Sequence, residues 1–175
     1  MAENHTKPEP WLRGTLTDLS AGQRAVIHAL QLAQEDIDRW GGALVPEELT
    51  ERPYGLPSVA FHLRHMVGSL DRLLTYAEGK TLSIEQMQSM AAEMDGPIDL
   101  QQMFKLFQQG LAAAEGRIRA IAVSVWPEPR AVGRKHLPTS VAGLLIHCAD
   151  HTQRHTGQAV TTAKLLLALR EDASA

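Results

Sequence analysis

Residues 140–170 decide the fold, and they read SVAGLLIHCADHTQRHTGQAVTTAKLLLALR. Apolar residues recur in this stretch every three or four positions, which is typical of one face of an α-helix. Thr139 or Ser140 at its start is a residue type that caps the free backbone N–H groups of a first helical turn. The pattern predicts a long amphipathic helix that ends near Arg170 and must bury its apolar face against other elements.

Two further helices are predicted in the first half of the chain. Apolar residues keep a helical period from Thr17 or Ser20 up to Gly41-Gly42, where a glycine in the left-handed conformation would end the helix. Prolines and glycines mark the segment that follows as a connection. A second apolar stripe begins after Ser58, a good N-cap residue, and ends at Gly79.

Two more helices are predicted in the second half. Residues 81–94 hold a short one with Ser83 as its N-cap, and a long one follows Asp99 and is closed by Trp126-Pro127. The loop at 127–138 mixes Pro, Gly and basic residues and is left unassigned, and no stretch shows a strand signal. We therefore predict an all-α fold, an antiparallel four-helix bundle with a short additional helix between long helices 2 and 3.

Length and composition fit one ordinary domain. The chain has 175 residues, of which 44% are hydrophobic and 21% are charged, values typical of globular proteins. Residues 1–15 contain Pro8, Pro10 and Gly14 and are predicted to form a flexible N-terminal arm, and residues 16–172 a single helical domain. The first residues lack the apolar core of a signal peptide, and no apolar run approaches about 18 residues, so we expect a cytoplasmic protein without a membrane partner.

Charge and cysteine content exclude several classes of function. Lys and Arg total 17 against 20 Asp and Glu, so there is no basic field for phosphates and we expect no nucleic-acid partner. The single cysteine, Cys148, excludes an intramolecular disulfide and a Cys-based metal cluster, and we interpret it as a core residue. Any metal site must therefore use histidine and carboxylate, which draws attention to the eight histidines.

Three histidines lie four residues apart on the predicted last helix, at positions 147, 151 and 155. Residues at this spacing lie about 6 Å apart on one side of a helix, so neighbouring imidazoles can reach one metal ion. His151 and His155 fall in line with the apolar stripe, whereas His147 lies nearer its edge. A solvated polar flank is the alternative interpretation, but unpaired imidazoles facing a core are costly, which favours ligands. Two imidazoles hold metal weakly, so a third ligand must come from a neighbouring helix.

The candidates for that third ligand are His62 and His65 on the predicted second helix. The helical wheel does not decide between them, although a shared spacing favours His65: it follows Ser58 by seven residues, as His147 follows Ser140. A site of three histidines leaves coordination positions for water or substrate, which is typical of catalytic metal sites. The remaining histidines are interpreted as ordinary surface or partly buried residues: His5, His28 and His136.

Two of these segments resemble the motifs of a known family. Residues 58–65, SVAFHLRH, followed by Asp71, and residues 147–158, HCADHTQRHTGQ, are similar to those of the DinB/YfiT-like superfamily of bacterial proteins. The closing motif of that family usually has Arg before Gly-Gln, where this chain has Thr156. Matched position by position, the resemblance implies three metal ligands: His65, His151 and His155.

The resemblance also implies a fold and a function. Members share a four-helix bundle with one divalent metal ion, usually nickel or zinc, on a histidine triad. Some relatives are transferases or isomerases that use a low-molecular-weight thiol such as mycothiol, bacillithiol or glutathione, and others look like hydrolases that use metal-bound water. We therefore expect a DinB-like, metal-dependent enzyme of the thiol-dependent kind that acts on a small molecule and forms a homodimer. The alternatives are a hydrolase and a non-catalytic, metal-stabilised bundle.

Overall fold

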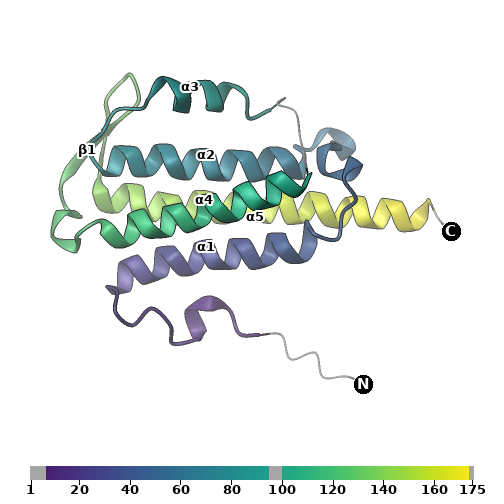
Figure 1. Cartoon of the computed structure of the whole chain (residues 1–175), viewed down its shortest axis with the longest axis horizontal. Helices are drawn as coiled ribbons and strands as arrows, with labels where there is room; N and C mark the ends of the chain where they lie inside the picture. The colour runs from purple at the N-terminus through teal and green to yellow at the C-terminus, as the bar shows by residue number, and fades with distance from the viewer. Residues whose placement is uncertain (1–6, 95–99, 174–175) are drawn as a thin grey trace.

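A computed structural model describes residues 7–94 and 100–173, which are mostly helical (Figure 1). The long helices are α1 (Ala21–Trp40), α2 (Val59–Ala77), α4 (Leu100–Ala120) and α5 (Val141–Asp172). The smaller elements are α3 (Ile84–Ala91), the strands β1 (Pro129–Val132) and β2 (Leu137–Ser140), and the 3-10 turns η1 (Pro10–Leu12), η2 (Glu47–Thr50), η3 (Pro53–Gly55) and η4 (Val123–Val125). Within the described ranges, no helix has the length and hydropathy that a membrane-spanning segment requires.

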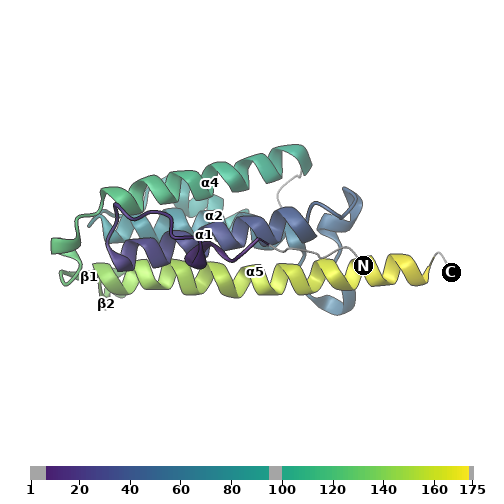
Figure 2. The same ribbon diagram turned by 90° about the horizontal axis from the view of Figure 1, so that it is seen from below.

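The four long helices lie side by side and run in two directions (Figures 1 and 2). In Figure 1, α1 and α5 run from left to right, and α2 and α4 run from right to left. Both α4 and α5 pack against both α1 and α2. Each long helix therefore has one parallel and one antiparallel neighbour, rather than the uniformly antiparallel neighbours that the sequence predicted. A short connection can join only antiparallel neighbours, and the stretch that carries α3 is long enough to cross over.

The predicted helix starts are confirmed wherever a serine provides the cap. The side chains of four serines accept a hydrogen bond from the backbone N–H three residues later: Ser20, Ser58, Ser83 and Ser140. The expected cap Asp99 lies outside the described residues. The left-handed cap expected at the end of α1 is wrong, because Gly41 has a right-handed φ of −70°. Glycine at this position instead lets the Phe104 ring pack close to the backbone, since a Cβ there would lie 3.2 Å from that ring.

The end of α4 and the loop after it differ from the prediction. The helix ends at Ala120, well before Trp126-Pro127, and Gln23 of α1 donates its side-chain N–H to the carbonyls of Ile118 and Ile121 at 3.1 and 3.2 Å. Such bonds satisfy carbonyls that the end of a helix leaves free. The loop left unassigned contains an antiparallel hairpin in which Pro129 of β1 pairs with Ser140 of β2. Its strands are too short, and too interrupted by proline, to show an alternating pattern.

The described part of the N-terminal arm contacts α1. Pro10 is buried, and the Arg13 guanidinium forms two hydrogen bonds of 2.6 Å with the Glu35 carboxylate. This pairing lowers the pKa of Glu35 below its ordinary value. Residues 7–13 are thereby linked to the helical body.

Candidate metal centre

Three histidines from two helices converge where α2 packs against α5. His65 of α2 and His151 and His155 of α5 each offer one ring nitrogen, and these three nitrogens lie within 4.8 Å of one another. The Nε2 atoms of His65 and His151 are 3.3 Å apart. The ring centroid of His155 lies 4.4 Å from that of His65 and 4.5 Å from that of His151. The structure thus brings together the three residues that the family resemblance implied as ligands, and we call them the histidine cluster.

The spacing and chemistry of the cluster fit a divalent ion. Nitrogens bound to tetrahedral zinc at about 2.0–2.1 Å lie roughly 3.3 Å from one another, close to the separation of His65 and His151. Burial, followed by the charge of neighbouring imidazoles, lowers the pKa of His151 to about 4 and also lowers that of His155. Neutral imidazole is the form that binds metals. His151 and His155 could therefore bind a metal ion in their neutral form.

His62 lies beside the cluster but plays a different part. Its side chain is buried, and its Nδ1 lies 3.0 Å from Nδ1 of His155, so that one of these nitrogens donates a hydrogen bond to the other. This contact leaves Nε2 of His155 for an ion. Nε2 of His62 has no hydrogen-bond partner among the described residues. Of the two candidates that the helical wheel left open, His65 lies with His151 and His155 in the group that could hold an ion, whereas His62 contacts His155 from outside that group.

A buried carboxylate that the sequence analysis missed holds His65 in place. Glu93 follows α3, is 7% exposed, and accepts a hydrogen bond of 2.7 Å from Nδ1 of His65 through Oε2. Its Oε1 accepts a hydrogen bond of 2.6 Å from Arg72. Burial alone would raise the pKa of Glu93, but the hydrogen bonds from His65 and Arg72 lower it. Carboxylates that bind the second nitrogen of a metal-ligating histidine fix its orientation.

The backbone of α2 leaves room for the Glu93 carboxylate at Gly68. A Cβ at Gly68 of α2 would lie 2.5 Å from Oε1 of Glu93 and 2.9 Å from Arg72. Glycine at this position therefore lets the carboxylate reach α2. Phe61 stacks on the His65 ring from another direction, with centroids 5.3 Å apart and planes 17° apart.

A cavity of about 210 Å³ opens beside His151. Its lining combines apolar, hydroxyl and charged side chains, including Ser69, Arg72, Tyr76, Met90 and Val132. Ser69 Oγ lies 3.4 Å from Nε2 of His65, so the cavity reaches the cluster. The half-exposed His147 lies at its edge, off the apolar stripe as predicted, with Nδ1 3.6 Å from Asp150.

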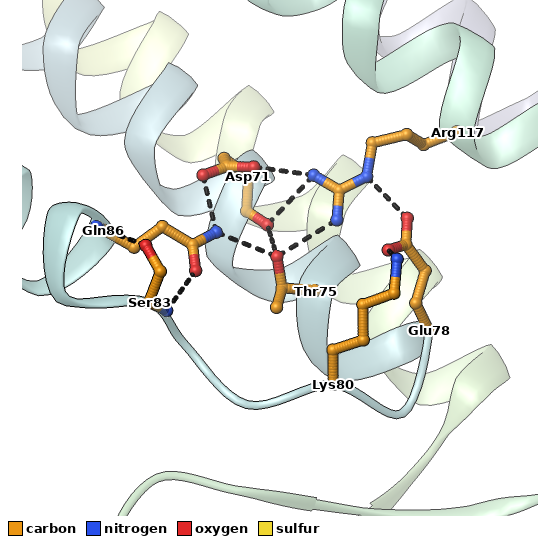
Figure 3. Close-up of polar contacts among 7 residues, drawn as sticks. All are labelled: Asp71, Thr75, Glu78, Lys80, Ser83, Gln86 and Arg117. Carbon is orange, nitrogen blue, oxygen red and sulfur yellow. Dashed lines mark hydrogen bonds and ion pairs between the residues drawn. The ribbon is translucent and has the colours of Figure 1, made fainter.

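Three other residues of interest lie outside the cluster. Cys148 is buried, as predicted, and burial raises the pKa of its thiol to about 12. Thr156, the departure from the family motif, is also buried and donates to the carbonyl of Thr152 at 2.9 Å. Asp71 lies on another face of α2, where it pairs with Arg117 (Figure 3). None of these three side chains belongs to the set that could hold an ion.

Comparison with known families agrees with the motifs. The family model described as DinB superfamily matches residues 29–159, which include His65, His151 and His155. No curated protein and no solved structure matches the chain.

Proposed function

The chain belongs to the DinB superfamily, and from this premise we propose that it is a thiol-dependent transferase or isomerase with one nickel or zinc ion on His65, His151 and His155. The observation that carries the proposal is the convergence of three imidazole nitrogens next to a cavity. We also infer that its long helices form the bundle of this family and that the protein is a homodimer.

The ligand set leaves a divalent ion with open coordination positions, where it would stabilise a bound thiol as the thiolate. The surrounding residues orient the ligands. Glu93 accepts from Nδ1 of His65, so that Nε2 of His65 faces the cluster, and the contact with His62 does the same for His155. The cavity beside His151 is large enough for the end of a small substrate.

One observation bears on the source of the thiol and a second on the choice between thiol and water. Cys148 is buried with a raised pKa, so a reacting thiol must come from a second molecule. The carboxylate at the cluster, Glu93, has one oxygen engaged by His65 and the other by Arg72. It is therefore poorly placed to take a proton from an attacking water, as a hydrolase of this kind would require.

Metal analysis of protein purified without an affinity tag tests the ligand set. We expect about one divalent ion per chain in the wild type and almost none in His151→Ala or His155→Ala. His147→Ala is the matched control, because His147 lies on the same helix outside the set, and it should keep its metal. A His151→Ala variant with full metal stoichiometry would contradict the proposal.

Cobalt-substituted protein separates the possible activities. Addition of glutathione, mycothiol or bacillithiol should change the visible spectrum of the cobalt if a thiol binds there. Hydrolysis of esters or amides without added thiol would support the hydrolase instead. A protein that gives neither result but melts at a lower temperature without metal has a structural ion only.

A further inference from the structure

A second and larger cavity lies between α2, α3 and α4. Its volume is about 670 Å³, within the range of about 300–1,000 Å³ that is usual for small-molecule sites. The described residues that line it include no histidine, and Arg72 is the one residue of α2 that also lines the cavity beside His151. We refer to it as the α3 cavity.

The floor of the α3 cavity is apolar. It is formed by side chains of α2 and α4: Leu63, Val67, Leu74, Met103, Phe107 and Ala114. The two helices are close together beside it, because a Cβ at Gly110 would lie 2.4 Å from the Val67 side chain. Such a floor favours apolar ligands, because covering it removes apolar surface from water.

The charged residues at the edge of the α3 cavity balance one another. Three arginines and three carboxylates line it: Arg64, Arg72, Arg117, Asp71, Glu85 and Glu93. Arg117 pairs with Asp71 at 2.7 Å and with Glu78 at 2.6 Å, and Arg72 pairs with Glu93 at 2.6 Å. Figure 3 shows the Arg117 guanidinium between Asp71 and Glu78. The edge therefore offers a ligand no net charge, and a charged ligand would have to compete with existing ion pairs.

The roof, α3, is held by polar contacts near its two ends rather than by a buried face. Near its start, Gln86 donates to Asp71 at 2.7 Å and to Thr75 at 2.9 Å (Figure 3). Just beyond its end, Glu93 binds Arg72. None of the side chains of α3 is buried. The helix α3 thus covers the cavity but contributes little apolar contact to the helices below it.

We propose that the α3 cavity is a binding site for a small, uncharged and largely apolar molecule, distinct from the histidine cluster. The apolar floor supplies the binding surface, the balanced edge excludes charged ligands, and α3 covers the bound molecule. The site needs no metal ion, because none of its described lining residues belongs to the histidine cluster.

Titration of the full chain with Nile red, an uncharged apolar dye, tests this site. We expect saturable binding of one dye per chain, with the same affinity in metal-free and metal-loaded protein. Ala113→Trp, at the cavity edge on α4, should weaken binding about tenfold or more. Ala112→Trp is the matched control, because Ala112 is the exposed neighbour of Ala113 and is not among the lining residues.

A second variant approaches the cavity from its roof. Ser89→Trp, on α3, should also weaken dye binding, whereas Gln88→Trp outside the lining should not. All four positions are exposed, so circular dichroism should confirm that each variant folds. Equal dye binding by Ala112→Trp and Ala113→Trp, or no saturable binding by the wild type, would overturn the proposal. Because both outcomes can be observed in the metal-free protein, neither depends on the metal site.

Discussion

The histidine cluster and the α3 cavity lie on two faces of the same helix and differ in chemistry. On the face toward α5, α2 presents the imidazoles of His62 and His65, and burial lowers the pKa of His62 to about 4. On the face toward α3 and α4, it presents apolar side chains and the ion pair of Asp71 with Arg117. Helical spacing alone separates them, since residues three or four apart share a face and their neighbours do not.

One pair of residues connects the two faces. Glu93 and Arg72 form part of the wall of the α3 cavity, and Glu93 also binds His65. The comparison shows that imidazole nitrogens make one face suitable for a cation. On the other face the charged side chains are paired with one another, which leaves that face suited to apolar ligands. A change in the shared pair should affect the cluster, whereas a change elsewhere around the cavity should not.

The largest effect is expected from Glu93→Ala. The change leaves Arg72 buried without its carboxylate, which should lower the free energy of unfolding by about 3–5 kcal/mol. It also frees the His65 ring, which should weaken metal binding roughly 10–100-fold. Chemical denaturation and metal titration measure the two effects. Glu93→Gln keeps an acceptor for His65 and should weaken metal binding less. Unchanged metal affinity in Glu93→Ala would show that the carboxylate does not position His65.

Acid should destabilise the two faces in different pH ranges. The folded state holds the pKa of His62 at about 4, below its ordinary 6.5, so the unfolded chain binds more protons between these values. Stability of the metal-free protein should therefore fall as the pH drops from about 6.5 to about 4, by on the order of 3 kcal/mol for this group.

The carboxylates of the ion pairs behave differently. The pKa values of Glu78 and Glu93 are lowered below the ordinary 4.5, so their stabilisation should be lost only as the pH falls below that value. Urea denaturation at a series of pH values measures both ranges. A flat stability between pH 6.5 and 4.5 would contradict the burial of neutral imidazoles.

The smallest effect is expected from Arg117→Ala. This change removes the ion pairs with Asp71 and Glu78 at one end of the α3 cavity, which are partly exposed and should be worth about 1 kcal/mol. Metal affinity should not change, because Arg117 does not contact the histidine cluster. Thermal unfolding and metal titration of the same sample test both statements. A loss of metal affinity as large as that of Glu93→Ala would mean that the two faces are not separate.

Local signals made most of the fold and part of the candidate site predictable. Serine caps and apolar periods gave the helix starts, and the spacing of His151 and His155 placed both on one side of α5. Contacts between distant segments were not predictable. Glu93 is 28 residues from His65 in sequence, and the free carbonyls at the end of α4 are satisfied by Gln23 of another helix. The hydrophobic periodicity of a segment gives no information about such contacts between residues that are far apart in the sequence.

Glu93 lies just beyond α3, so its hydrogen bond to His65 depends on a helix that has few packing contacts. Because α3 buries none of its side chains, it can fray at far lower energy than the long helices can unfold. Each such opening would withdraw the carboxylate and let the ring turn. The rate at which a bound ion exchanges with solvent would then follow the rate at which α3 opens. A chelator could remove the ion while the four long helices stay folded.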